Sequence, residues 1–472
     1  MRKFSLALLP LALLASASAA QAPGFSATDK QLGAQEHPKL IAQFGGAYRG
    51  PQAEYVRTVG QRIAAQSGMA TRPTDYTVTL LNSNDNNAFA IPGGYVYITR
   101  QLLALMNDEA ELAFVMGHEV GHVAARHSQK RQQRSALSGL GAALLGAVTG
   151  SDIIGRVAGT GAQLYTLGFS RDQERQADSL GVRYLTSSGY DPMASGDILA
   201  SLGAQTALEA RLAGRSASAP ATWLSTHPAN GERVARIRKE ASTFTARAGA
   251  RATNRDRFLD AIDGMPYDDD PAEGVITGTS FRHPALAMAF EAPQGFALQN
   301  SPAAVMGNAG ANGRFEFSGG KPDTADLTAY SAALWQKAGA TGGTPRLTRI
   351  NGIDAAISTT RANTKGGAVD ATLAVYRWAP DAYYHILAIA PAGRDPGYDQ
   401  LINSLRRLTP AEVRGIRGRR VQVLTVKRGD TVQSLAERMA YTDDRLARFT
   451  ILNGIEANTR LVPGSRIKLI VQ

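Results

Sequence analysis

The sequence His-Glu-Val-Gly-His at residues 118–122 stands out in a chain that has seven histidines and no cysteine. The residues around it, 107–129, favour a helix, with a polar cap, acids in the first turn and apolar flanks. His118 and His122 would face the same way, because residues four apart are about one helical turn apart. Two imidazoles at this spacing can hold one cation, and Glu119 lies close enough to reach a water molecule at that cation. The pattern predicts a metal site for hydrolysis, and its alternative is a polar face on an ordinary helix.

A third ligand is expected on a second helix. Ser170 and Gln173 have the spacing of a capping box and predict a helix that starts near residue 171. Glu174 and Asp178 fall on one face of that helix. The alternative for Glu174 is an exposed carboxylate paired with a neighbouring arginine, and the His-Glu-x-x-His pattern favours the metal ligand instead.

Together these motifs resemble the gluzincin metallopeptidases that include the HtpX heat-shock peptidase and the CAAX prenyl proteases. Four motifs carry the resemblance: NAFAIPGGYVYITRQLL at 87–103, HEVGH at 118–122, SRDQERQAD at 170–178 and STHPANGERVARI at 225–237. The sequence offers no segment of about 18 uninterrupted apolar residues, which is closer to the soluble periplasmic, BepA-like branch of that family. The resemblance implies one zinc ion per chain, held by His118, His122 and Glu174.

The resemblance also implies roles for three further residues. Glu119 would be the general base that takes a proton from the attacking water and returns it to the leaving amine. Asp178 would accept a hydrogen bond from a ligand imidazole, with a solvated helix acid as the alternative. His227 would steady the oxyanion or, as in some soluble relatives, occupy the open zinc position and silence the enzyme; the alternative is a turn residue held by Pro228. The remaining histidines lack partners at ligand spacing and are expected to be structural or surface residues: His37, His127, His283 and His385.

Substrate binding is expected at a short strand before the metal helix. Residues Asn87, Ala88, Phe89 and Ala90 lie between a polar loop and a Pro-Gly-Gly turn and suit an edge strand, to which an extended substrate adds as one more strand. Binding led by the backbone selects unfolded chains over folded proteins. The alternative is an ordinary core strand.

The elements that must position these residues follow from the hydrophobic periodicity. Helical spacing at 30–70 gives way to strands at 76–81, 88–91 and 95–99, and helices dominate from 107 to 246. The predicted fold is therefore multidomain and begins with a mainly α gluzincin-type metallopeptidase domain with a small sheet. The predicted boundaries are a metallopeptidase domain at 30–246, a linker at 247–274, a small α+β domain with an antiparallel sheet and no assigned role at 275–410, and a basic linker with a LysM-like βααβ module at 411–472.

The C-terminal residues 423–472 resemble a LysM module, in which turns read N-acetylglucosamine polymers. This resemblance implies that the chain binds peptidoglycan, and the alternative is a docking module with a structural role. Every proposed ligand and catalytic group lies between 118 and 227, so deletion of 411–472 is expected to leave zinc content and cleavage nearly intact.

The N-terminus and the charge of the chain indicate where it works. Residues 1–20 combine a basic start, an apolar run and small residues, as in a cleavable signal peptide, which predicts a periplasmic or secreted protein. The formal net charge of +11 favours anionic surroundings, and without an aromatic-studded basic motif it does not indicate a nucleic acid. Residues 135–169 predict two helices rich in small residues that pack together or rest on a membrane face.

These observations predict a secreted zinc endopeptidase that hydrolyses unfolded or misassembled envelope proteins. The alternative is a largely latent protease domain in a cell-wall-bound adaptor or chaperone. The set of His118, His122, Glu174 and Glu119 favours the enzyme, because an adaptor has no need of Glu119.

Overall fold

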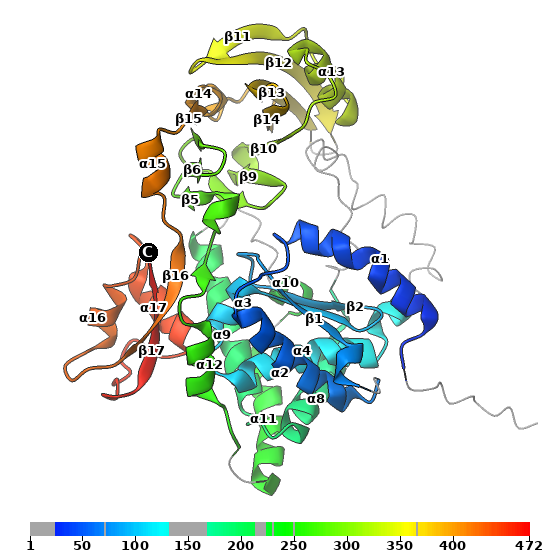
Figure 1. The fold of residues 1–472 in the computed structure, drawn as a ribbon, viewed down its shortest axis with the longest axis vertical. Helices are drawn as coiled ribbons and strands as arrows, with labels where there is room; N and C mark the ends of the chain where they lie inside the picture. The colour runs from blue at the N-terminus through cyan, green and yellow to red at the C-terminus, as the bar shows by residue number, and fades with distance from the viewer. Residues whose placement is uncertain are drawn as a thin grey trace, which may run out of the picture.

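The computed structural model describes residues 24–69, 72–131, 168–212, 223–228, 231–248, 251–364 and 367–472. The expected signal peptide and nearly all of the expected helix pair at 135–169 lie outside the described residues. Within the described ranges, none of the helices has the length and apolar character needed to cross a membrane. Figure 1 shows a helical part, a part built from sheets, and a small C-terminal module that lies against the helical part.

The helical part surrounds a three-stranded sheet. In this sheet β3 lies in the centre, parallel to β1 and antiparallel to β2, so β2 is an edge strand. The three strands lie close to the predicted positions: β1 (Thr77–Leu81), β2 (Ala88–Ile91) and β3 (Tyr95–Thr99). The helices of this part are α1 (Ala27–Gln43), α2 (Gln52–Ala64), α3 (Arg100–Leu105), α4 (Glu109–Ala124), α8 (Arg171–Ser187), α9 (Ala194–Leu212), α10 (Trp223–Thr226), α11 (Gly231–Ala248) and α12 (Arg255–Ile262).

Helix α4 carries the His-Glu-x-x-His sequence through the middle of this part. Asp108 caps its first turn by accepting a hydrogen bond from the backbone N–H of Glu111. All residues from Glu109 to His122 are buried, because the helix is apolar on most of its surface and is covered on several sides. A helix in this position holds its side chains in one place.

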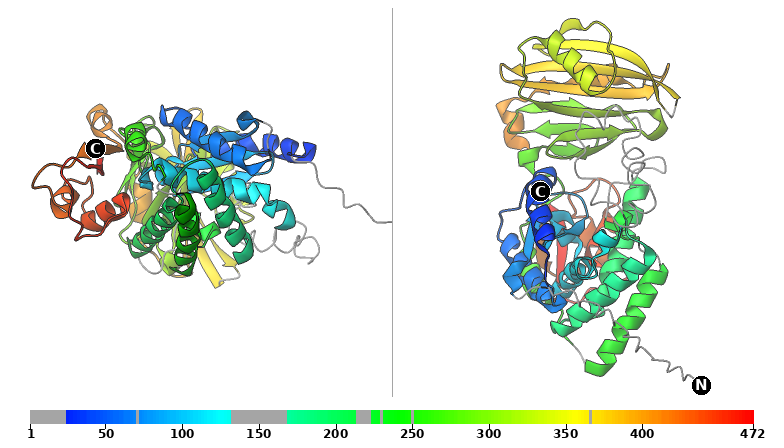
Figure 2. Two further views of the ribbon diagram at one scale, coloured as in Figure 1. Left: turned by 90° about the horizontal axis from the view of Figure 1, so that it is seen from below. Right: turned by 90° about the vertical axis from the view of Figure 1, so that its right-hand side faces the viewer.

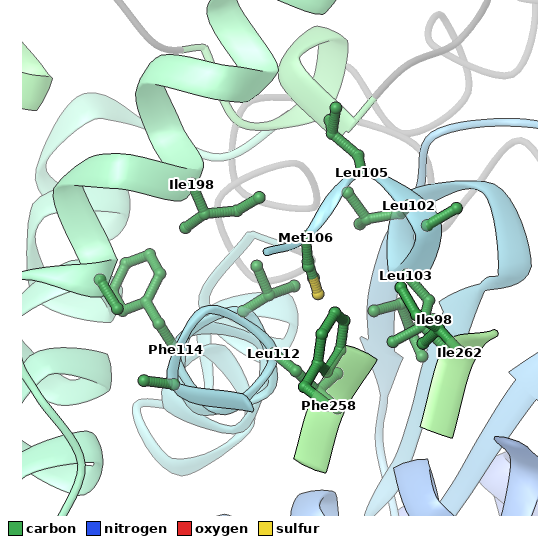
Figure 3. Close-up of a cluster of buried hydrophobic side chains, with 14 of the residues drawn as sticks. Ile98, Leu102, Leu103, Leu105, Met106, Leu112, Phe114, Ile198, Phe258 and Ile262 are labelled. Carbon is green, nitrogen blue, oxygen red and sulfur yellow. The ribbon is translucent and has the colours of Figure 1, made fainter. Parts of the chain in front are cut away.

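Residues 247–274 differ from the expected linker. They contain α12 and the short strand β4 (Pro266–Tyr267), and Phe258, Leu259 and Ile262 are fully buried. Figure 3 shows Phe258 and Ile262 among core side chains that include Met106 and Leu112. The charged and acidic composition indicated a linker, but these three apolar residues form one stripe on a helix and are buried in the core of the helical part.

The middle part consists of two antiparallel sheets, where one sheet in a small α+β domain was expected. The right-hand view of Figure 2 shows two layers of strands stacked above the helical part. Phe281 and Phe290 of the smaller sheet pack against Phe315 and Phe317 of the larger one. The smaller sheet has the order β15-β7-β6-β5, and the larger has the order β11-β12-β13-β14-β10-β9-β8. The elements are β5 (Val275–Thr277), β6 (Ser280–His283), β7 (Met288–Glu291), β8 (Ala297–Asn300), β9 (Ala304–Asn308), β10 (Arg314–Gly320), α13 (Leu327–Lys337), β11 (Arg346–Ile350), β12 (Ile353–Thr364), β13 (Gly367–Ala379), β14 (Ala382–Pro391), α14 (Tyr398–Ser404) and β15 (Arg406–Arg407).

The C-terminal module has the expected order of strand, two helices and strand. After α15 (Pro410–Gly415) come β16 (Arg419–Thr425), α16 (Val432–Ala436), α17 (Arg445–Asn453) and β17 (Arg466–Val471). Strand β16 pairs with β17 on one side and with β4 on the other, so the module continues a sheet that begins before the middle part.

The module shares its hydrophobic core with the helical part. Phe449, Leu452, Leu469 and Ile470 are buried in the same cluster as the residues around α4. The sequence pattern does not reveal this, because the apolar residues of a small module look the same whether they face each other or a neighbouring domain.

A buried lysine joins the module to the loop before α4. The side chain of Lys468 is fully buried and donates hydrogen bonds to the carbonyl oxygens of Ala104 at 2.8 Å, Leu105 at 3.2 Å and Met106. These carbonyls end helix α3, where a cation is favourable. Burial lowers the pKa of the Lys468 ammonium. Lys468 thus caps the end of α3. Its hydrogen bonds fix the position of the module against the helical part, in addition to the apolar contacts of the shared core.

Because the module shares its core with the helical part, deletion of 411–472 should destabilise the helical part, whereas the sequence predicted little effect. Leu469→Ala is expected to lower the free energy of unfolding of the helical part by about 2–5 kcal/mol, because it opens a cavity in the common core. Val462→Ala, at a side chain that is 65% exposed in the same module, is the control and should change it by less than about 0.5 kcal/mol. The readout is the temperature at which the full chain unfolds. Equal temperatures for both variants would restore the independent module that the sequence predicted.

Candidate metal centre

Three side chains from two helices converge in the helical part. The Nε2 atoms of His118 and His122 lie 3.0 Å apart, and those atoms lie 3.6 Å and 3.4 Å from the nearer carboxylate oxygens of Glu174. All three residues are buried. Together with His227, they form a group whose candidate ligand atoms all lie within 4.8 Å of one another.

Small residues let the two helices approach closely enough for this convergence. A Cβ atom added at Gly117 of α4 would lie 3.3 Å from Cα of Gly181 of α8, and one added at Gly121 would lie 3.2 Å from the carbonyl oxygen of Ala177. Helix α8 begins at the predicted capping box, in which Ser170 and Gln173 bond to each other's backbone. The close packing brings the first turn of α8 beside the last turn of α4.

The donor set fits zinc in both chemistry and spacing. Two imidazole nitrogens and one carboxylate are a typical set for a catalytic zinc, which keeps a fourth position open. Ligand atoms at about 2.0–2.1 Å from a tetrahedral zinc lie about 3.4 Å from one another. The observed separations of 3.0, 3.4 and 3.6 Å bracket that value.

Asp178 lies on the outer side of His118. Its Oδ1 atom is 3.0 Å from Nδ1 of His118, and the guanidinium group of Arg233 donates to both of its oxygens, at 2.7 and 3.0 Å. Arg236 also donates to Asp178. Burial alone would raise the pKa of this carboxyl, but His118 and Arg233 outweigh it and lower the pKa. Asp178 is fully buried and is therefore not a solvated helix acid.

Glu119 lies beside the ligand group without being part of it. The indole N–H of Trp223 donates a hydrogen bond of 2.8 Å to its Oε1 atom, and Nε2 of His227 is 3.6 Å from the same oxygen. Trp223 and His227 lie one helical turn apart around α10, and their rings stack with centroids 4.7 Å apart. Glu119 is 1% exposed, so its carboxylate is held in a fixed and nearly dry position.

His227 reaches into the ligand group. Its Nδ1 atom lies 2.9 Å from Oε1 of Glu174 and 3.2 Å from Nε2 of His118. Burial alone would lower the pKa of His227, but the carboxylates of Glu119 and Glu174 outweigh it and raise the pKa. Arg233 donates a hydrogen bond of 2.9 Å to the carbonyl oxygen of His227 and so fixes the loop that carries it.

His127, which was expected to be a structural or surface residue, lies inside the core and contacts a ligand. It is fully buried, and its Nδ1 atom lies 2.9 Å from Nδ1 of His122. Arg126 adopts a positive φ of 56°, which ends α4 and turns the chain so that the following residue comes back under the ligand. The other three histidines are remote from the group: His37 bonds to Tyr97, His385 lies near Ser318, and His283 bonds to the backbone N–H of Leu286.

The sequence pattern did not single out Trp223, Arg233 or His127. Two signals could have found them. Arg233 lies inside the STHPANGERVARI motif, and His127 follows the second ligand by five residues. Their partners lie on other elements, and only the packing of α4, α8, α10 and α11 brings them together.

Strand β2 lies at the edge of the sheet, next to α4. Asn87, Ala88 and Phe89 are buried and Ala90 is half-buried. The ring of Phe89 stacks on Tyr97 with centroids 4.7 Å apart and packs against Phe44 of α1. A peptide at this edge would therefore meet the backbone of β2 rather than the side chain of Phe89.

Comparison with known proteins agrees with this geometry. Residues 51–241 match the family model "Peptidase family M48", and residues 424–469 match "LysM domain". The chain is 32% identical over 198 residues to the beta-barrel assembly-enhancing protease of Yersinia pestis, which covers 40% of this chain and 39% of that protein.

Two further relatives are metallopeptidases by name. The mitochondrial metalloendopeptidase OMA1 of Arabidopsis thaliana is 32% identical over 190 residues, which cover 39% of this chain and 36% of that protein. The metalloprotease LoiP of Escherichia coli is 28% identical over 218 residues, which cover 46% of this chain and 79% of that protein. The chain spans about two fifths of the length of the first curated relatives that it matches. The chain thus carries a peptidase family M48 domain at residues 51–241, whose donor set is that of a zinc site, and a LysM domain at residues 424–469.

Proposed function

We propose that the protein is a zinc-dependent endopeptidase that cleaves unfolded or misassembled proteins of the bacterial envelope. The position of Glu119 carries this proposal. A buried carboxylate directly beside three convergent zinc donors has a use in peptide hydrolysis and none in a binding protein. The names of both relatives support the same activity, and the name beta-barrel assembly-enhancing protease supports an envelope setting.

The side chains suggest how the reaction proceeds. His118, His122 and Glu174 would hold zinc, which supplies Lewis-acid chemistry by polarising the peptide carbonyl and lowering the pKa of water. Glu119 would take a proton from the attacking water, and the hydrogen bond from Trp223 keeps its carboxylate oriented for that transfer. Glu119 would then pass the proton to the leaving amine. Asp178 would keep His118 in the tautomer whose Nε2 atom has a free lone pair.

The substrate would add to β2 as a further strand. The place of β2 at the sheet edge and its contact with α4 support this reading, because a peptide bonded to β2 would run past the ligand group. Backbone pairing requires an extended chain, which folded proteins rarely offer.

Replacing Ala90 with Pro removes one backbone N–H from β2 and should raise the KM for casein. An unchanged KM would show that the substrate binds elsewhere.

Metal removal tests the activity directly. Casein cleavage is expected to stop when zinc is removed by a chelator and to return when one equivalent of zinc is added, since the three donors form one site. If the zinc-free protein still cleaves casein, the proposed zinc-dependent activity is wrong.

Localisation and wall binding belong to the same proposal. A signal peptide at residues 1–20 would export the chain, and the LysM domain would retain it on peptidoglycan. In the module, the turns around Gly429 and Gly464 face away from the shared core, because both are exposed. Contacts to sugar should survive 1 M salt, where the Debye length is only about 3 Å and attraction by the basic residues 414–420 is screened. If 1 M salt alone releases the intact protein from peptidoglycan, charge attraction accounts for the binding and the LysM domain does not contact sugar.

The position of His227 favours a second candidate, a largely latent protease domain. Its Nδ1 atom lies at ligand distance from the other donors, so in this arrangement it would be the fourth donor and would exclude substrate.

His227→Ala is therefore expected to retain zinc and to cleave casein several-fold faster. The matched control is His37→Ala, which removes a half-buried histidine bonded to Tyr97 and should change neither property. A slower His227→Ala variant with full zinc content would instead assign His227 to the reaction, as in oxyanion binding.

A further inference from the structure

We propose that His127 and Gln176 are positioning residues that hold His122 in the tautomer able to bind zinc. This inference rests on the proposed zinc site and concerns two residues that touch neither the zinc position nor the substrate. They form a chain of hydrogen bonds from the second ligand to the surface of α8.

The chain runs through three side chains. Nδ1 of His122 lies 2.9 Å from Nδ1 of His127, and Nε2 of His127 lies 3.0 Å from Oε1 of Gln176. His127 is fully buried between them, and Gln176 is exposed on the first turns of α8. The Gln173 side chain donates to the backbone carbonyl of His127 at 3.4 Å, so the capping residue of α8 also holds the middle of the chain.

The orientation of the amide at the outer end fits one set of proton positions along the chain. In this structure the carbonyl oxygen of Gln176 faces Nε2 of His127, and because a carbonyl oxygen only accepts, this arrangement places the hydrogen of His127 on Nε2. The Nδ1 atom of a neutral His127 is then an acceptor, and it requires the hydrogen of His122 to be on Nδ1. The Nε2 atom of His122, which faces Glu174 and His118, is left with a free lone pair. The flipped amide would reverse both imidazoles and place that hydrogen on the zinc-binding nitrogen.

Among the residues that the structure describes, His127 is the one that lies within hydrogen-bond distance of the Nδ1 atom of His122. Phe169 stacks on its ring, with centroids 3.9 Å apart and an angle of 28° between the planes. His122 itself is 4% exposed. A water molecule thus has little access to its Nδ1 atom, and the orientation of the ring depends on His127.

The two histidine ligands are supported differently. His118 faces the carboxylate of Asp178, which is itself bonded to Arg233 and Arg236, whereas His122 faces a neutral imidazole. The neutral partner fixes the tautomer of His122 without adding a further charge near the carboxylates of Glu119, Glu174 and Asp178. Loss of His127 should therefore weaken zinc binding while it leaves the net charge of the site unchanged.

Variants at position 127 test the proposal through zinc affinity. His127→Leu removes the acceptor and is expected to weaken zinc binding about 10–100-fold in a competition titration with a chromophoric chelator. His127→Asn keeps an acceptor oxygen near the position of Nδ1 and should restore most of that affinity. His37→Leu, which replaces a histidine remote from the ligands, is the control and should bind zinc as the unaltered protein does.

A measurement on the unaltered protein covers the case in which His127→Leu does not fold. Nitrogen-15 NMR of the zinc-loaded, histidine-labelled protein should show His127 protonated on Nε2 and His122 protonated on Nδ1. Protonation of His127 on Nδ1, or zinc affinity unchanged in folded His127→Leu, would overturn the positioning role. Failure of the unaltered protein to bind zinc would overturn the proposed function itself, so the two failures are distinguishable.

Discussion

Glu119→Gln is expected to keep one zinc ion per chain and to lower the kcat for casein cleavage by about 10²–10⁴-fold, the usual contribution of a general base. The amide has nearly the same size as the carboxylate and can still accept the hydrogen bond from Trp223, so the surroundings should hold. What it lacks is the ability to take a proton from water. Metal analysis and initial cleavage rates of the same preparation provide the measurement.

Glu54→Gln is the matched control for this variant. Glu54 lies on the exposed surface of α2 in an ion pair with Arg57, so its replacement should change neither zinc content nor rate. If Glu119→Gln cleaves casein as fast as this control does, Glu119 takes no part in proton transfer.

Glu174→Ala is expected to lose zinc and activity together. When His227 is not bound to zinc, only the imidazoles of His118 and His122 would remain, and two imidazoles alone form a weak site. The loss of zinc affinity should clearly exceed the roughly 10–100-fold loss typical when a partner of a ligand is removed. Equilibrium dialysis against zinc measures it.

Asp178→Asn distinguishes the role of Asp178 from that of Glu174. Asp178 already accepts hydrogen bonds from Arg233 and Arg236 and lies on the Nδ1 side of His118, so its loss should weaken zinc binding without abolishing it. If Asp178→Asn loses zinc and Glu174→Ala keeps it, Asp178 is the ligand and Glu174 supports it.

Local sequence patterns predicted the elements of the site well. The capping box at Ser170 and the apolar spacing around 107–124 depend on neighbouring residues, so the starts of α8 and α4 follow from the sequence alone. The strand pattern of β1 to β3 is equally local. The approach of Glu174 to His118 came from the resemblance, because no pattern in the chain measures the distance between two helices.

The parts that were missed depend on contacts between distant segments. Phe258 is buried because α12 packs against α2 and α4, and Lys468 is buried because the C-terminal module packs against α3, α9 and α12. Likewise, the role of His127 appears only when α4 has ended at Arg126 and α8 lies alongside. Burial of this kind is a property of the assembled core, so composition indicated a linker and a separate module where the structure has one continuous core.

X-ray absorption at the zinc edge tests the central claim most directly. The purified, zinc-loaded protein is expected to contain one zinc ion per chain with nitrogen and oxygen neighbours only, two or three of them imidazoles according to whether His227 is bound, because the chain has no cysteine. The imidazole signal should fall on replacement of His122 with Ala. A protein that binds no stoichiometric zinc, or whose zinc environment is unchanged in His122→Ala, would contradict the metal centre described for α4 and α8.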